Sequence, residues 1–382
     1  MATAEPAERV GTEPAVRVST LELFFDLVFV STMTALTAVL AKDLTWRGLG
    51  NIGLLLGVIL WMYGGYAWLT NAVAPTNRLR RTLVLVGMGG FLVMALAIPD
   101  AFGASGWAFG AGYFVVNAVH SGLFLHSAGP GGVAVMRGLA PLNLLSAGLV
   151  LAGGFLPGPW RYASWAAALA VQIITPYLHS LGGYSISAAH FVERHGLVVI
   201  VALGESIVAI GIGAAGLTLD LRLVAVAVLG LTLSYYLWWV YFEGDDGGAE
   251  RALAAVEPQR RPRAALNAYG YAHYPLLLGI VVLAAGVKVA IAKSTAELTL
   301  AQALALGGGV ALFLFGDVAY RRVLSIGRSR YRLWGAIGVL ATVPLGLVRA
   351  VAQLVPLIVV LLAMLVIEAR AGRSRATWPG KG

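Results

Sequence analysis

Twelve stretches of about 20 mostly apolar residues follow one another along this chain, and they limit its possible folds more than any other feature. Each is long enough to cross a bilayer as a helix. Only 12% of the 382 residues are charged, whereas soluble domains have about a quarter. So few charged groups could not cover a soluble protein of this length. The sequence therefore predicts an all-α polytopic integral membrane helix bundle, and excludes an ordinary soluble enzyme, a disordered chain and a DNA-binding protein.

The predicted spans are separated by short polar or turn-forming segments. Pro157-Gly158-Pro159, a turn signal, separates the fifth span from the sixth. The last two spans form one apolar stretch that we divide between Leu345 and Gln353. The twelve predicted spans are residues 21–41, 48–70, 81–102, 106–126, 134–155, 160–181, 191–213, 219–243, 264–292, 297–320, 331–349 and 352–370.

Positive charge is distributed unevenly between the two sides that these spans define. Twelve spans place both termini on one side, and 20 of the 27 Lys and Arg residues fall on that side. Because cytoplasmic loops carry an excess of positive charge, we expect a plasma-membrane protein with both termini in the cytoplasm. The net charge of +9 then reflects topology and requires no nucleic-acid partner.

The two halves of the chain resemble each other weakly. Glu22 and Glu193 align at an offset of 171 residues, and Trp61-Met62-Tyr63 aligns with Trp239-Val240-Tyr241 at an offset of 178. Six spans separate the copies, so both enter the membrane in the same direction, as in a parallel repeat. We predict a cytoplasmic tail at 1–20, six-helix repeats at 21–181 and 182–370, and a second tail at 371–382.

Charged side chains inside a span are the best indication of a functional site, because each costs about 2.5–3.5 kcal/mol at the bilayer centre. Glu22 and Asp26 are four residues apart and share one face of the first span. Two carboxylates so placed suit cation binding or proton exchange. The alternative is that Glu22 lies at the interface and Asp26 pairs with an arginine or caps a neighbouring helix.

A second group of ionisable residues opens the seventh span. His190 lies three residues before Glu193, so the two share a face, and a His–Glu pair at this spacing can bind a metal. Arg194, which follows Glu193, is a further ion-binding or transport candidate. Two ligands do not make a metal site, and we predict neither a metal centre nor a cofactor. The alternative is a polar start to the helix with a local ion pair.

Glu205 is the most informative single residue. It lies twelve residues beyond Glu193, about 18 Å along a helix, which puts it near the bilayer midplane. Ser206 follows it, in a helix rich in small residues. A midplane carboxylate is typical of a binding or coupling residue in transporters, although a buried structural hydrogen bond would also explain it.

Two kinds of aromatic side chain complete the candidates. His273 lies in the ninth span and could relay protons because histidine titrates near neutrality, or could simply be a packed hydrogen-bond partner. Trp61 and Trp68 lie near the end of the second span, where an interfacial aromatic belt would explain the terminal ones.

Two long motifs resemble those of a known family. Leu21–Val30 reads LELFFDLVFV, and His190–Gly211 reads HFVERHGLVVIVALGESIVAIG. Together with Trp238–Phe242 and Tyr271–Pro275, they are similar to the bacterial low temperature requirement A family over roughly residues 18–370. The family is named for a growth phenotype in the cold, so the resemblance implies a membrane protein and leaves its biochemical activity open.

The sequence departs from the family pattern at three places. The segment after the second span, Asn71–Asn77, has no acidic residue, although family members often carry acids there. Asn117 and Gln172 stand where the resemblance implies an arginine and an aspartate. Part of the family's polar network is therefore absent from this chain.

These observations favour a transporter or channel-like permease for an ion or small solute. Its partners would be the lipid bilayer and a small cation, proton or small-molecule substrate, with homo-oligomerisation as a further expectation. We expect no enzymatic activity. The alternatives are a membrane-embedded enzyme that acts on lipid, with His–Glu pairs as acid and base, and a non-catalytic membrane factor that supports growth in the cold.

Overall fold

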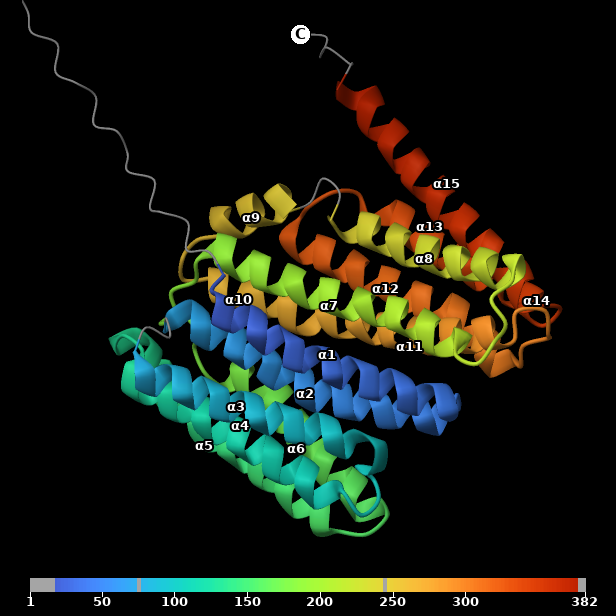
Figure 1. Ribbon diagram of the computed structural model, residues 1–382. Coiled ribbons are helices and arrows are strands. Elements are labelled where there is room, and N and C mark those ends of the chain that lie inside the picture. The colour runs from blue at the N-terminus through green and yellow to red at the C-terminus, as the bar shows by residue number, and fades with distance from the viewer. Residues whose placement is uncertain (1–17, 74–76, 243–245, 377–382) are drawn as a thin grey trace, which may run out of the picture.

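The computed structural model describes residues 18–73, 77–242 and 246–376, and these ranges contain helices and no strand (Figure 1). The predicted tails lie largely outside the described residues. The helices are α1 (Thr20–Lys42), α2 (Trp46–Ala72), α3 (Arg78–Ala97), η1 (Ile98–Asp100), α4 (Gly106–Ser127), α5 (Pro130–Phe155), α6 (Pro159–Leu178), α7 (Ala188–Ala214), α8 (Leu221–Phe242), α9 (Asp246–Ala255), α10 (Arg261–Ala265), η2 (Leu266–Tyr271), α11 (His273–Ala292), α12 (Leu300–Leu324), α13 (Ser329–Leu340), α14 (Val343–Gly346) and α15 (Ala350–Ala376).

Local sequence signals set several helix ends. Ser19 caps α1, and its backbone N–H donates in return to the Glu22 carboxylate, which forms a capping box. Thr299 and Gln302 form the same motif at the start of α12. Gly158 has a φ of +49° and leads into α6, so the predicted turn between the fifth and sixth spans is confirmed.

Ten helices among the described residues are long and apolar enough to cross a membrane, and the prediction of a polytopic helix bundle is confirmed. The predicted spans 160–181 and 331–349 are not among the ten. The first corresponds to α6, which is helical but less apolar. The second is broken into α13 and α14, and the 12 residues of α13 extend only about 18 Å, short of the roughly 30 Å hydrocarbon layer.

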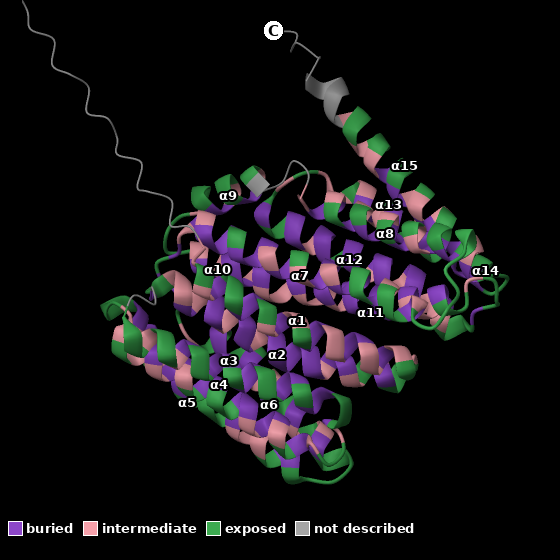
Figure 2. Cartoon of the chain, in the orientation of Figure 1, coloured by how far each residue is buried: buried purple, intermediate pink, exposed green. Residues whose placement is uncertain are grey.

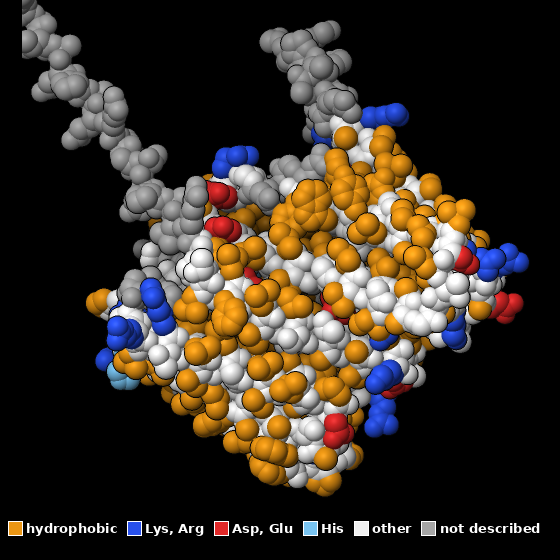
Figure 3. Space-filling model, in the orientation of Figure 1, with side chains coloured by type: hydrophobic (Ala, Val, Ile, Leu, Met, Phe, Trp, Pro, Cys, Tyr) orange, Lys and Arg blue, Asp and Glu red, His pale blue; other side chains and the backbone are white. Residues whose placement is uncertain are grey.

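Apolar side chains cover the outside of the bundle. Leu27, Leu96, Val228 and Val359 are each more than half exposed, although they lie within spans. In Figure 3 hydrophobic side chains cover most of the visible face, and Lys and Arg gather toward the ends of the helices. Figure 2 shows the buried residues along the sides of the helices that face one another. This is the surface that a lipid environment requires.

Helices α1 and α7 lie side by side and run in the same direction (Figure 1). Side-chain contacts join them at two levels with a nearly constant offset, 168 residues between Asp26 and Arg194 and 171 between Thr34 and Glu205. A constant offset requires parallel helices. Helix α11 is largely buried and packs against α1, α7 and α12.

Two helix crossings, one in each half of the chain, are built in the same way. A Cβ added at Gly90 of α3 would lie 2.8 Å from the carbonyl oxygen of Gly112 in α4. A Cβ added at Gly279 of α11 would lie 2.7 Å from the carbonyl oxygen of Gly309 in α12. Only glycine allows the backbones of each helix pair to approach this closely.

The order of helix contacts is also the same in both halves. In the first half α1 packs on α3, α3 on α4, α4 on α5 and α5 on α6. In the second half α7 packs on α11, α11 on α12, α12 on α13 and α13 on α15. A parallel repeat would give a common contact order of this kind. The division into domains at 21–181 and 182–370 stays a prediction.

Candidate functional site

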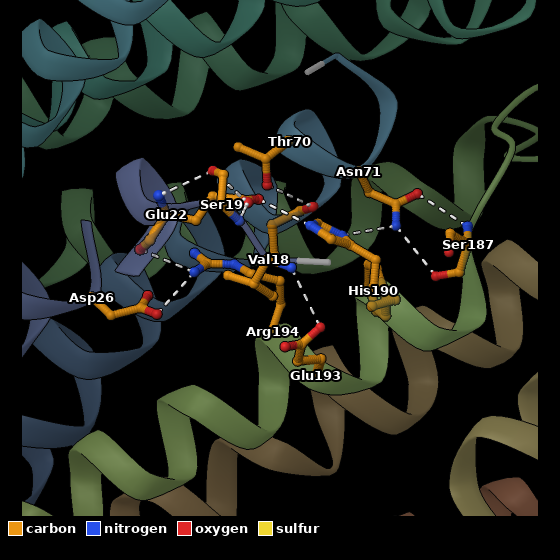
Figure 4. Close-up of polar contacts among 12 residues, drawn as sticks. Val18, Ser19, Glu22, Asp26, Thr70, Asn71, Ser187, His190, Glu193 and Arg194 are labelled. Carbon is orange, nitrogen blue, oxygen red and sulfur yellow. Dashed lines mark hydrogen bonds and ion pairs between the residues drawn. The ribbon is translucent and has the colours of Figure 1, made fainter. Parts of the chain in front are cut away.

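A buried cluster of ionisable side chains lies between α1 and the start of α7 (Figure 4). It consists of Glu22 and Asp26 from α1 and His190 and Arg194 from α7, and each of the four residues is at most 4% exposed. The acidic pair and the basic pair each repeat at one turn of their helix, so both members of each pair face the neighbouring helix. The cluster therefore joins two candidate groups that are far apart in the sequence.

Asp26 is the best-bonded acid of the cluster. Its Oδ2 atom lies 2.8 Å from Arg194 Nη1, and its Oδ1 atom accepts a hydrogen bond of 2.8 Å from the Tyr63 hydroxyl of α2. Arg194 Nη1 also donates to the backbone carbonyl of Glu22 at 3.1 Å, and Arg194 Nε has no partner among the described residues. The aspartate–arginine alternative considered for Asp26 is therefore the arrangement found.

Glu22 faces His190 rather than Asp26. Its Oε1 atom lies 3.1 Å from His190 Nε2, and its Oε2 atom accepts from the Ser19 hydroxyl and backbone N–H at 2.8 and 2.7 Å.

Asn71 determines the orientation of the His190 imidazole. Its amide pairs with the backbone N–H and carbonyl of Ser187, which leaves Nδ2 3.3 Å from His190 Nδ1. His190 Nδ1 is then the acceptor, and the ring proton lies on Nε2, toward Glu22.

Glu193 does not join the cluster. It is exposed, and its carboxylate accepts from the backbone N–H of Val18 at 3.4 Å (Figure 4). His190 contacts Glu22 instead of Glu193, so the predicted His190–Glu193 face does not form a site. No group of three or more metal-ligating side chains occurs in the described part of the chain.

Glu205 is buried and lies apart from the cluster, further along α7. Its Oε2 atom accepts a short hydrogen bond from the Thr34 hydroxyl of α1. Ser206 is also buried, and its hydroxyl has no partner within the described ranges. The carboxylates of α1 and α7 are therefore bonded separately and do not converge on one cavity.

A second buried ion-pair network was not found from the sequence. Asp317 of α12 lies 2.9 Å from Arg321 and 3.7 Å from Arg332 of α13, and Arg332 lies 2.8 Å from Glu368 of α15. Both guanidinium groups also donate to the backbone carbonyl of Val240. The sequence feature that could have revealed this network is the spacing of Asp317 and Arg321, which are four residues apart in an apolar span.

Three arginines that the sequence analysis counted among the charges indicating topology have a second role. Arg194, Arg321 and Arg332 neutralise buried acids.

A cavity of about 260 Å³ lies between the two halves of the chain. Its lining comes mainly from the C-terminal halves of α2, α4 and α6 and from the N-terminal halves of α5, α7 and α11. Eight of the lining residues are aromatic, among them Trp61, Trp68 and Tyr274. None of the described residues that line it is an Asp, Glu, Lys or Arg. Trp61 and Trp68 border this cavity. The sequence analysis had offered an interfacial aromatic belt as the explanation for tryptophans at the ends of spans.

The cavity wall includes a π-helical turn, η2, which precedes α11. His273 follows this turn, and its Nδ1 atom lies 2.8 Å from the Ala268 carbonyl while its Nε2 atom lies 2.8 Å from the Tyr241 hydroxyl. Both ring nitrogens are therefore bonded, as the packed alternative for His273 predicted. Short π-helical segments inside α-helices are frequent at functional sites.

Of the ionisable candidate residues predicted from the sequence, His273 is the one that lines the cavity. Tyr63 connects the cavity with the charged cluster, because it is one of the lining residues and its hydroxyl bonds Asp26. His195, which follows Arg194, lines it as well. Tyr184, from the segment between α6 and α7, closes one side, and burial raises the pKa of its phenol, which keeps it uncharged.

Comparison with known proteins agrees with this architecture. The model of the family described as bacterial low temperature requirement A protein (LtrA) matches residues 17–368, nearly the whole chain. A protein of Rhizobium meliloti (strain 1021), named Uncharacterized protein RA0937, is 29% identical over 321 residues, which cover 80% of this chain and 77% of the relative. The motifs around α1 and α7 that first suggested this family contain the charged cluster. The chain belongs to the bacterial low temperature requirement A family.

Proposed function

We propose that this protein is a transporter or channel-like permease for a small organic solute, and that the cavity between its two halves is the solute-binding site. The observation that carries the proposal is the double position of Tyr63, which lines the cavity and bonds the buried Asp26–Arg194 pair. A solute that displaces the Tyr63 ring would also disturb that ion pair.

The size and position of the cavity support this assignment. Helices from both predicted repeats line it, so a movement of one half against the other would change its shape. An apolar cavity of about 150 Å³ is large enough to admit benzene. At about 260 Å³, this cavity can hold a small organic molecule.

The carboxylates have a different role in this proposal from the one that their spacing suggested. Glu22 and Asp26 are bonded to His190 and Arg194, so they are poorly placed to bind a free cation. A buried ion pair is costly to break on one side only, and such a pair can bias a structure between two states. We assign the cluster to coupling, in which solute binding and proton exchange act on the same ion pairs.

A non-enzymatic role is part of the proposal. A lipid-acting enzyme would use a histidine and a carboxylate as acid and base around a substrate position. The paired histidine and glutamate, His190 and Glu22, lie in the buried cluster and neither lines the cavity.

Reconstituted flux is the direct test. Proteoliposomes with a trapped pH-sensitive dye would be exposed in turn to ethanolamine, glycerol, alanine and lactate, and protein-free liposomes serve as the blank. We expect at least one solute class to move protons or solute faster than the blank, and Asp26→Asn to reduce that flux about tenfold. Gln353→Leu, which alters a buried glutamine of α15 outside the cavity, is the control.

The same assay tests the midplane carboxylate. Glu205→Gln keeps the size of the side chain and removes its charge, so a folded variant with unchanged flux would exclude Glu205 from coupling. Flux at the level of protein-free liposomes for every solute class, from protein that retains its fold, would contradict the transporter proposal itself.

A further inference from the structure

Several polar side chains around the cavity are already bonded to the protein. The hydroxyl of Tyr274 donates to the Gly53 carbonyl, and that of Tyr271 donates to the Ile173 carbonyl. Both ring nitrogens of His273 have partners as well. None of these three lining side chains has a free donor for a ligand.

Two other lining residues have unpaired acceptor atoms that a ligand cannot reach. Gln172 Oε1 and His120 Nδ1 have no hydrogen-bond partner within the described ranges. Each of the two atoms has less than 1 Å² of accessible surface. Packing therefore encloses both acceptors, and neither takes part in recognition of a ligand.

The polar groups of the lining that remain open are chiefly donors. The indole N–H groups of Trp61 and Trp68 form no hydrogen bond in the described part of the chain, and the same holds for the Tyr184 hydroxyl and the Asn143 amide. None of these groups is among the enclosed unpaired atoms, so they keep accessible surface. An indole N–H can only donate, whereas a hydroxyl or an amide can donate or accept. A ligand that pairs the two indoles must therefore offer acceptors.

Two of these residues lie next to each other. The ring centroids of Trp68 and Tyr184 are 5.2 Å apart, so one indole and one phenol form a single part of the lining. Trp61 lies seven residues before Trp68 in α2, about two helical turns away on the same face. The open indole donors therefore follow one side of the cavity.

One open group of the lining is a fixed acceptor. His195 Nδ1 lies 2.8 Å from the Phe191 carbonyl and is the donor nitrogen, so Nε2 is the acceptor of the neutral ring. No hydrogen bond to Nε2 occurs among the residues that the structure describes. This atom can take one donor from a ligand, but it leaves the requirement of the two indoles unchanged.

The lining favours a neutral ligand over an ion. None of its described residues is an Asp, Glu, Lys or Arg, so a net charge removed from water would have no counter-ion there. Aromatic faces attract a cation, but the N–H groups of an ammonium ion cannot pair with indole donors. An anion can accept from those donors, but no positive side chain balances its charge. A neutral molecule with acceptor oxygens avoids both costs.

We infer that the cavity binds a neutral organic molecule with an apolar or aromatic body and carbonyl or ether oxygens, which accept hydrogen bonds from Trp61 Nε1, Trp68 Nε1 and the Tyr184 hydroxyl. The inference deepens the proposed function by naming the substrate class, and it rests on that proposal only for the choice of site. Binding itself requires no transport.

Four naphthalenes of nearly equal shape test the inference on the full chain in lipid nanodiscs at pH 7.4. They are 1-acetylnaphthalene, which is a neutral ketone, 1-isopropenylnaphthalene, in which a CH₂ group replaces the carbonyl oxygen, 1-(1-naphthyl)ethylamine, which is an ammonium, and 1-naphthoate, which is an anion. Titration calorimetry measures each affinity, with empty nanodiscs correcting for partition into lipid. We expect the ketone to bind about tenfold more tightly than each of the other three probes.

The ketone and the hydrocarbon differ in one acceptor atom, so their comparison isolates the hydrogen bond. Equal affinity of these two probes would mean that the open donors take no part in binding. Tighter binding of the ammonium or of the carboxylate would mean that the lining selects a charge. Any of these results, or no binding of the ketone, would overturn the inference.

Two tyrosines supply matched variants. Tyr184→Phe removes an open hydroxyl of the lining and should weaken ketone binding about fivefold, with the affinity for the hydrocarbon unchanged. Tyr162→Phe removes a hydroxyl that also has no partner within the described ranges but lies outside the cavity, and should change neither affinity. If Tyr184→Phe binds the ketone as tightly as the unaltered protein, the assignment of that donor is wrong. If it does not fold, the probe series on the unaltered protein decides alone.

Binding and flux fail in different ways. Selective ketone binding without flux in proteoliposomes would contradict the transporter proposal and leave the ligand class standing. Flux of ethanolamine or lactate, together with no preference for the ketone probe, would contradict the ligand class and leave transport standing.

Discussion

The hydroxyl of Tyr63 lies 2.8 Å from Asp26 Oδ1, and the same tyrosine borders the cavity between the two halves of the chain. Asp26 is in turn 2.8 Å from Arg194 across the contact between α1 and α7. One side chain therefore touches both the space that could hold a ligand and the ion pair that joins the halves. A ligand bound in the cavity could therefore act through Tyr63 on the contact between α1 and α7.

Tyr63→Phe tests that route. Phenylalanine keeps the ring in the cavity wall and removes the hydrogen bond to Asp26. We expect a loss of about 1–2 kcal/mol of stability, a modest change in ligand affinity and a large loss of flux. Thermal unfolding in detergent and proteoliposome uptake measure these quantities. Normal flux in a folded Tyr63→Phe variant would show that the hydrogen bond plays no part in coupling.

Asp26→Asn should be among the most destabilising single changes in α1. It leaves the Arg194 guanidinium buried without its counter-ion, which costs about 3–5 kcal/mol. Replacing both residues, as in Asp26→Leu with Arg194→Met, removes the charges together and should cost much less than the sum of the single changes. A double-mutant cycle on the free energy of unfolding measures the coupling. Additive effects would mean that the two charges do not interact.

The two glycine crossings should respond alike to alanine. Gly90→Ala and Gly279→Ala each force a methyl group into the backbone of the opposing helix, at a cost of about 1–3 kcal/mol. Gly89 and Gly308 lie beside crossing glycines but have no atom within 4 Å of an added Cβ. Their alanine variants should be neutral or slightly more stable, because alanine favours helix. Melting temperatures of the four variants compare the crossings, and a tolerated Gly279→Ala beside a damaging Gly90→Ala would argue against equivalent halves.

The second ion-pair network predicts a graded pair of effects. Asp317→Asn removes the acid that faces both Arg321 and Arg332, so we expect it to destabilise the protein by about 3–5 kcal/mol. Glu368 is partly exposed and pairs at the edge of the network, so Glu368→Gln should cost less than half as much. Denaturant unfolding of the two variants gives the order. The reverse order would place the centre of the network at Glu368.

Much of the fold follows from local sequence. Stretches of about 20 apolar residues predict helices wherever they occur, and the caps at Ser19 and Thr299 and the turn at Gly158 are readable from a few neighbouring residues. The exceptions are also local in cause. The segment at 331–349 has the apolar composition of a membrane span but breaks into α13 and α14. The start of the ninth span forms the π-helical turn η2, which the helical periodicity of a sequence does not predict.

The candidate residues were found from the cost of burying charge, but their partners were not. The sequence identified Glu22, Asp26, His190, Arg194 and Glu205 as unusual. It could not pair Asp26 with Arg194 across 168 residues, and it paired His190 with the wrong glutamate.

The sequence by itself determined that this protein is a bundle of membrane-type helices, where most of them begin and end, and which charged side chains carry a cost that something must offset. These properties depend on residues within one or two helical turns. The tertiary structure alone decided which charge offsets which, that α1 lies against α7, and that a cavity lined with aromatic residues lies between the halves. Those properties depend on how apolar helix faces pack, and nearly equivalent faces can pack in many ways until the side chains of distant segments meet.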